Sequence, residues 1–268
     1  MVWNCARRRR NLTPNDTMNY HWNWGIFWEM SADGRHTWFM TLIIGLGWSL
    51  ATAFCAGIIA LSLGTALGVI RTTPYKWAVR LGNAYVELFR NIPLLVQLFL
   101  WFFVMPELLP KAMGTAIKQM SPPWASFVPA FIGLGLFTAA RVSEQVRAGI
   151  QALPRGQGAA GTAMGLTLAQ TYRYILLPMA FRIIMPPLTS ETMNLIKNTS
   201  VALTIGLIEL TAAARSMQEF TFQVFEAFTA ATVIYIIVNL TVVNLMRWFE
   251  KSIAIPGFVG PQVVEGAH

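Results

Sequence analysis

One uncharged segment constrains the fold of this chain more than any other feature. From Thr37 to Ile70 the sequence carries no Asp, Glu, Lys or Arg and consists mostly of apolar residues. A helix that crosses a bilayer needs roughly 20 such residues, so this segment is long enough to span a membrane and is expected to tilt or project into water. Across the chain 55% of residues are hydrophobic and 12% are charged, about half the charged share of a typical soluble domain. Most of this apolar surface must therefore face lipid.

Four further apolar stretches predict an all-α integral membrane protein with five transmembrane helices. The fourth stretch is unusually polar, and its apolar half alone is too short to cross a bilayer. The predicted spans cover about 37–70, 81–109, 126–147, 187–210 and 227–248. The predicted domains are an N-terminal extension with an outer interfacial segment (1–36), the transmembrane domain (37–254) and a C-terminal tail (255–268). Four glycines are spaced for close helix packing: Gly64, Gly68, Gly133 and Gly135.

Lysines and arginines predict the orientation. They are concentrated between spans one and two, between spans three and four, and after span five. Cytoplasmic loops carry the excess of positive charge, so the N-terminus is expected outside and the C-terminus inside. The net charge of +8 is also compatible with nucleic-acid binding, but the basic residues cluster at the ends of apolar stretches. No nucleic-acid partner is therefore expected.

The basic block Arg7–Arg10 does not fit this orientation, because it would have to cross the membrane. Neither a long apolar region nor a small-residue cleavage site follows closely enough to make a signal peptide. Met18 begins a more plausible start, with aromatic residues suited to the outer interface. Residues 1–17 are therefore expected to be an upstream extension.

A small signature lies between spans three and four, within a loop predicted at about 152–182. Ala159-Ala160-Gly161 is followed by Gly165 and then by Ile175-Leu176-Leu177-Pro178. Gly165 can adopt the positive φ that ends a helix, and Thr167 with Gln170 forms a capping box that opens the next one. With Pro178 as a stop signal, the pattern predicts a helix, a sharp turn and a second short helix. An ordinary amphipathic hairpin between two spans is the alternative.

This signature resembles the coupling loop of ABC importer permeases, whose pattern is Glu-Ala-Ala, three residues, Gly, nine residues and Ile-x-Leu-Pro. The chain departs from it with Ala159 in place of the acid and Gly161 in place of the second alanine. Residues 85–97, 138–147 and 186–200 are similar to the second-, third- and fourth-span motifs of polar amino-acid ABC permeases. The match runs in order from Trp22 to Gly260 and most closely resembles permeases of glutamate/aspartate importers.

The resemblance implies a bacterial inner-membrane complex. The chain would pair with a second homologous permease, sit on a dimer of cytosolic ABC ATPases and receive an acidic amino acid from a periplasmic binding protein. It has no phosphate-binding Gly-x-x-x-x-Gly-Lys-Ser/Thr sequence. No cofactor is therefore expected on this chain, and ATP is expected to be used by the partner ATPase. The residues implied in ATPase coupling are Ala159, Ala160, Gly161, Gly165, Leu166, Ile175, Leu177 and Pro178.

Arg141 and Lys197 are the candidate contacts to substrate. A charged residue inside a membrane is costly and is by default a functional candidate, and a guanidinium can hold a carboxylate at two points. The rise of a helix places both cations near mid-depth, where they are expected to meet. The alternative is internal pairing of Arg141 with Glu144 and of Lys197 with Glu191 or Glu144. The full predicted substrate set is Arg141, Glu144, Glu191, Asn194, Lys197, Asn198, Thr199 and Ser200.

Other chemistry has little support in the sequence. The three histidines are scattered, so neither a metal site nor a catalytic group is expected. Glu87 and Arg90 are spaced for a local ion pair. Two other functions stay open: a permease of the same architecture for glutamine, histidine or arginine, and an ATP-independent secondary transporter or membrane scaffold. Secondary transporters commonly contain internal repeats, and no second copy of any motif is visible.

Overall fold

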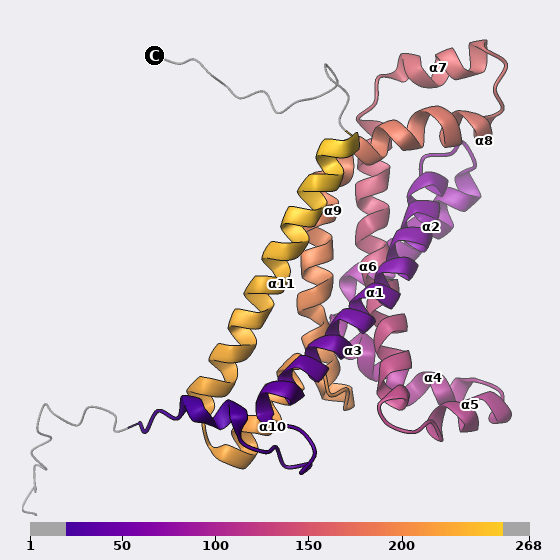
Figure 1. Cartoon of the computed structure of the whole chain (residues 1–268). Coiled ribbons are helices and arrows are strands. Elements are labelled where there is room, and N and C mark those ends of the chain that lie inside the picture. Colours follow the sequence, from indigo (N-terminus) through magenta and orange to yellow (C-terminus); the bar gives the residue numbers. More distant parts are fainter. Residues whose placement is uncertain (1–19, 254–268) are drawn as a thin grey trace, which may run out of the picture.

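The computed structural model describes residues 20–253, which form helices and turns with a single isolated β-bridge between Met30 and Thr37. Two long helices, α1 (Trp38–Ile70) and α6 (Trp124–Gln151), make the most extensive helix contact. α9 (Leu177–Asn198) packs on α6, and α11 (Val224–Ile253) stands beside α9 (Figure 1). The prediction of an all-α fold is confirmed for this part of the chain. The predicted extension 1–17 and tail 255–268 lie outside the described residues.

Glycines allow α1 and α6 to approach closely. A Cβ atom at Gly64 would lie 2.7 Å from Val142 Cβ, and one at Gly68 would lie 2.6 Å from Val146 Cβ. Both separations are too short for real side chains, so these positions of α1 accept only glycine against the valines of α6. The predicted packing role of the two glycines is confirmed.

The second predicted span is not one helix. It is divided into α2 (Lys76–Asn91) and a second part that contains α3 (Leu94–Phe99), a π-helical turn η2 (Leu100–Val104) and α4 (Met105–Leu108). The two parts are bent by 103°. The break lies at Ile92-Pro93, where Ile92 is extended with φ of −95° and ψ of 129°, the conformation that a following proline favours. The predicted span over 81–109 is therefore not one continuous helix, and α5 (Lys111–Lys118) follows as a separate short helix.

The fourth span also differs from its predicted bounds of 187–210. After α7 (Arg155–Ala163), the chain runs from α8 (Leu168–Thr171) through a π-helical turn, η3 (Tyr172–Leu176), directly into α9. The prediction that Pro178 stops this helix is wrong. Pro178 lies in the first turn of α9, and the wide π-turn before it leaves room for its ring.

The C-terminal end of α9 is irregular. A 3-10 helix, η4 (Thr199–Ile205), follows it, and the chain then bends by 50° into α10 (Leu210–Thr221). Gly206, with φ of +83°, occupies the break. Within residues 20–253, three helices are long and apolar enough to cross a membrane, or up to five if each bent pair counts as one span. Those three are α1, α6 and α11, where the first, third and fifth spans were predicted.

Candidate functional site

The loop between α6 and α9 has the local geometry that its sequence predicts. Gly165 has a φ of +78°, and the backbone N–H of Leu166 donates to Gly161 O at 3.1 Å, which closes the end of α7. Thr167 and Gln170 form the predicted capping box, with Thr167 N–H donating to Gln170 Oε1 at 2.8 Å. We call residues 155–176 the signature loop. Its second helix is not short, because it continues into α9.

The first helix of the signature loop packs tightly on its second half. A Cβ atom at Gly161 would lie 2.9 Å from Thr171 Cγ2 and 3.0 Å from Ile175 Cδ1. Gly161 is therefore the point at which α7 rests against the π-turn. Ile175 and Leu177 of the predicted set are half-buried at this end of the molecule.

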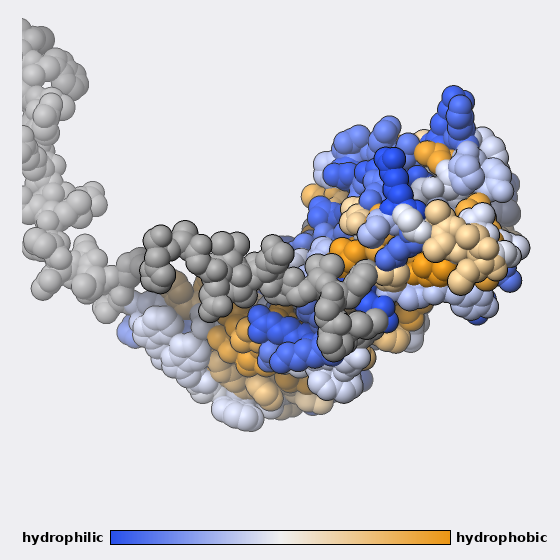
Figure 2. All heavy atoms as spheres, turned by 90° about the horizontal axis from the view of Figure 1, so that it is seen from above, coloured by the Kyte–Doolittle hydropathy of each residue, from blue (hydrophilic) through white to orange (hydrophobic). Residues whose placement is uncertain are grey.

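The opposite side of the signature loop is open and partly apolar. Ala159 and Ala160 are exposed, as are Met164 and Tyr174, whose side chains are the most exposed large apolar groups of the loop. Figure 2, which looks onto this end, shows mostly hydrophilic surface on the side where α7 and α8 lie, interrupted by hydrophobic patches. Met164 was not among the residues predicted from the sequence, although its position directly before Gly165 places it at the turn. The exposed surface of the loop is thus partly hydrophilic and partly hydrophobic.

A buried arginine joins three helices at the same end of the molecule. Arg71, with only 6% of its side chain exposed, donates to Asn83 Oδ1 of α2 at 2.8 Å and to Ser143 Oγ and Glu144 Oε1 of α6 at 3.2 and 2.8 Å. Sequence reasoning missed this role, although Arg71 is the first charge after the uncharged run.

Glu144 is shared by further cations. Arg147 approaches its second oxygen at 3.0 Å, and Arg90 lies 3.4 Å from the first. The expected pair of Arg90 with Glu87 is therefore wrong, because α2 turns Arg90 toward α6 and leaves Glu87 exposed.

Arg141 lines a polar cavity of about 370 Å³ together with Arg90, Glu144, Gln145 and Glu191. Its Nη1 atom lies 3.7 Å from Glu191 Oε1 on α9, and its guanidinium lies 5.0 Å from the centre of the Phe137 ring. Internal pairing is thus present, but with Glu191 and not with Glu144. The 3.7 Å separation exceeds hydrogen-bond distance, so the pair is loose.

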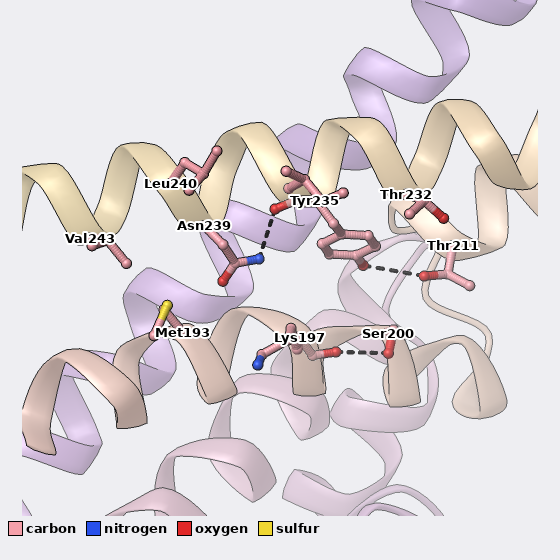
Figure 3. Close-up of a pocket in the computed structure, with 10 residues that line it drawn as sticks. Met193, Lys197, Ser200, Thr211, Thr232, Tyr235, Asn239, Leu240 and Val243 are labelled. Carbon is pink, nitrogen blue, oxygen red and sulfur yellow. Dashed lines mark hydrogen bonds between the residues drawn. The ribbon is translucent and has the colours of Figure 1, made fainter.

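Lys197 lines a different cavity, of about 510 Å³, between α9, α10 and α11 (Figure 3). Among the described residues it makes no ion pair. Ser200 Oγ donates to Lys197 O at 2.7 Å, Asn239 Nδ2 donates to Tyr235 O at 2.7 Å, and Asn239 Oδ1 is buried without a hydrogen-bond partner. The expected meeting of Arg141 and Lys197 does not occur, because α9 presents Glu191 and Lys197 to different neighbours.

The other predicted substrate residues are distributed around these cavities. Thr199 is fully buried and donates its hydroxyl to Ile196 O at 2.7 Å. Asn194 and Asn198 are half-buried and line neither of the two cavities. The structure therefore groups Arg141, Glu144 and Glu191 at one place and Lys197 with Ser200 at another.

Comparison with known proteins gives consistent matches. Residues 58–255 match the family described as binding-protein-dependent transport system inner membrane component. The chain is 46% identical over 244 residues to glutamate/aspartate import permease protein GltJ of Escherichia coli (strain K12), covering 91% of this chain and 99% of that protein. It is 31% identical over 214 residues to glutamate/aspartate import permease protein GltK of Escherichia coli O6:H1, covering 80% and 93%.

A solved structure described as an amino acid ABC transporter with histidines is also similar. It matches with a TM-score of 0.66 and 30% sequence identity, over 80% of this chain and 95% of that chain. The extent of these matches decides against a secondary transporter or a scaffold. The chain belongs to the family of binding-protein-dependent transport system inner membrane components, and it is a transport subunit and not an enzyme.

Proposed function

We propose that this chain is the permease subunit of an ATP-driven importer that moves glutamate and aspartate from a periplasmic binding protein to the cytosol. The two relatives named for glutamate/aspartate import support this substrate class. The observation within the chain that carries the proposal is the loosely paired Arg141, which faces a polar cavity between α2, α6 and α9. A permease for another polar amino acid is the second candidate, favoured by the solved relative with histidines.

The charges of the Arg141 cavity match an acidic amino acid. The side chains of Arg90 and Arg141 are 55% and 45% exposed, so both guanidinium groups are accessible. Each can hold one carboxylate of the substrate through paired N–H donors. Glu191, released from its long contact with Arg141, accepts the substrate ammonium. A glutamine side chain would leave one of the two guanidinium groups without an anion.

The Lys197 cavity provides a second polar position along the same spans. Lys197 is its exposed cationic donor, and the lone pairs of Ser200 Oγ are acceptors. This combination suits a carboxylate and an ammonium together. We assign Asn194, Asn198 and Thr199 a supporting role, because the two asparagines lie on α9 beside Lys197 and Thr199 follows the end of α9, where its hydroxyl donates to Ile196 O.

The exposed face of the signature loop, to which the buried Tyr172 does not belong, is the docking site for the ATPase in this proposal. This face, with Ala159, Ala160 and Met164, meets an ATPase dimer, while a second homologous permease completes the membrane part. This arrangement has five spans in a bacterial inner membrane, with the N-terminus outside and α7 in the cytosol, as the distribution of positive charge favours. ATP is hydrolysed by the partner, and this chain supplies the path.

Substitution of Arg141 tests the substrate class. Arg141→Lys keeps the charge but loses the paired donors, and Arg141→Met loses both. A hydrogen bond to a charged group is worth about 1.5–3 kcal/mol, so KM for glutamate and aspartate should rise roughly 10- to 100-fold in Arg141→Met and less in Arg141→Lys. Uptake is measured with the complete importer in proteoliposomes, and glutamine uptake is measured in parallel.

The matched control is Arg215→Met on α10, where the arginine is exposed and, among residues 20–253, pairs only with Glu219 four residues away. Its KM for glutamate should stay at the wild-type value. Equal losses for acidic and neutral substrates in an assembled Arg141→Met complex would contradict the acidic specificity. That result would make Arg141 a structural partner of Glu191 and favour the second candidate.

A further inference from the structure

We infer that Tyr172 is a positioning residue that connects the signature loop to the Arg141 cavity through the turn between α1 and α2. This inference rests on the proposed function, since it concerns how ATPase movement reaches the substrate. The direct covalent route, from α8 through η3 into α9, passes beside Glu191. The route through Tyr172 is separate and reaches Arg90 and Glu144, the other charged side chains of that cavity.

The first step of this route is the contact of Tyr172 with the α1–α2 turn. Tyr172 is 8% exposed, and its ring lies in a core cluster with Val146 and Ile184. Its hydroxyl donates to Thr72 O at 2.9 Å and lies 3.0 Å from Thr72 Oγ1. A phenylalanine would fill the same apolar space, so Tyr172→Phe removes only the hydroxyl contacts with the turn.

The second step joins Tyr172 to α7. Thr171 and Ile175, which flank Tyr172 in the same stretch of helix, are the two residues against which Gly161 packs. A displacement of α7 by the ATPase therefore presses on the segment that carries the Tyr172 ring. Close-packed contacts of this kind transmit displacement because they leave no space to absorb it.

The third step joins the turn to the cavity. Arg71, the residue before Thr72, is held by Asn83 of α2 and by Ser143 and Glu144 of α6. Glu144 in turn contacts Arg90, and both line the cavity with Arg141. Movement of Thr72 moves the Arg71 backbone, and the shared carboxylate of Glu144 then redistributes between Arg71 and Arg90. This changes how much of Arg90 is available to the substrate.

The experiment uses the complete importer in proteoliposomes with the variant Tyr172→Phe. Three quantities are measured: co-purification of the ATPase, basal ATP hydrolysis, and its stimulation by the substrate-loaded binding protein. The first two should stay at wild-type values, and the stimulation should fall about fivefold, as expected for the loss of one hydroxyl hydrogen bond. Tyr75→Phe is the matched control, because Tyr75 lies three residues after Thr72, outside the signature loop, and is 56% exposed. It should behave as wild type.

A second variant tests the same route from the other end. Arg71→Lys keeps the charge but removes the forked donors, and it should reduce the stimulation without loss of assembly. The double variant with Tyr172→Phe should be no worse than the stronger single variant, because both interrupt one route. Additive losses, or full stimulation in Tyr172→Phe, would overturn the inference. So would a loss of ATPase co-purification in both Tyr172→Phe and Arg71→Lys, which would make these residues purely structural.

Gly165→Val separates failure of this inference from failure of the proposed function. Gly165 has a positive φ, so valine strains the loop itself whatever space is available. If Gly165→Val loses stimulation and Tyr172→Phe does not, the loop is the ATPase contact and only the Tyr172 route is wrong. If neither variant changes stimulation, the assignment of the loop as the coupling element is wrong.

Discussion

Gly161 illustrates how one residue sets the packing of the signature loop. The family pattern has alanine at this position, yet here a Cβ atom would lie within 3.0 Å of three side-chain atoms, two of them from Thr171. Thr171 is buried and donates its hydroxyl to Thr167 O at 3.0 Å. The departure from the pattern is therefore explained by the threonine across the loop.

Gly161→Ala should loosen α7 from the loop. Alanine favours the helix by about 1 kcal/mol relative to glycine, but overpacking typically costs about 1–3 kcal/mol, so the net effect should be destabilising. Hydrogen exchange of the α7 amides should become faster in the assembled importer. Thr171→Ala removes both close atoms of the threonine, so it should restore slow exchange when combined with Gly161→Ala. Unchanged exchange in Gly161→Ala alone would show that α7 shifts without loss of packing.

The break between α2 and α3 shows how one side chain can satisfy the backbone at a bend between two helices. Pro93 ends α2 and leaves carbonyl groups without helical partners, which is costly in lipid. Gln97, only 4% exposed, donates its Nε2 to Phe89 O at 2.8 Å and to Ile92 O at 2.9 Å. One side chain of α3 thus caps the end of α2 across the bend.

Gln97→Leu should destabilise this break. The substitution keeps the volume and leaves two buried carbonyl groups unsatisfied, at a cost of about 1–3 kcal/mol for each. The thermal unfolding midpoint of the purified chain in detergent should fall by several degrees. Gln119→Leu, at the exposed end of α5, is the control and should leave the midpoint unchanged. A Gln97→Leu chain as stable as the control would mean that water or lipid headgroups reach these carbonyls.

At the scale of the whole molecule, a buried carboxylate joins three helices beside the second break. Glu209 is fully buried at the start of α10 and accepts the backbone N–H groups of Thr211 and Ala212, both at 2.9 Å. It also accepts the hydroxyls of Ser49 from α1 and Tyr235 from α11, at 3.3 and 2.9 Å. The side wall of the Lys197 cavity therefore depends on one acid.

Glu209→Gln should weaken this junction. The substitution replaces one acceptor oxygen with an NH₂ group, which would face the N–H and O–H donors around Glu209. Hydrogen bonds to a charged group are worth about 1.5–3 kcal/mol each. We expect a lower unfolding midpoint in detergent and easier proteolysis of the 206–209 break. Glu219 lies on the exposed side of α10 and, in the described part of the chain, is paired only with Arg215. Glu219→Gln should therefore change stability by less than about 1 kcal/mol. Equal stability of the two variants would contradict a structural role for Glu209.

The sequence alone determined the features that depend on local chemistry or on the total amount of apolar surface. The uncharged run 37–70 became α1 with Thr37 as its cap, because a long apolar segment has no other way to satisfy its backbone in lipid. Gly165 and the capping box of Thr167 were predictable for a similar reason, since backbone conformation and neighbouring side chains decide them.

Only the tertiary structure decided which side chains meet. Arg141 faces Glu191 because of how α6 and α9 are rotated, and spacing along one helix had favoured Glu144 instead. Arg90 leaves Glu87 for Glu144 for the same reason. Pro178 and Pro93 each remove one backbone donor, yet the helix continues through Pro178 and bends at Pro93. The π-turn before Pro178 leaves room for its ring, whereas Gln97 caps the carbonyl groups that are freed before Pro93. Helix rotation and the partners of freed backbone groups arise from packing between distant segments, which no local pattern specifies.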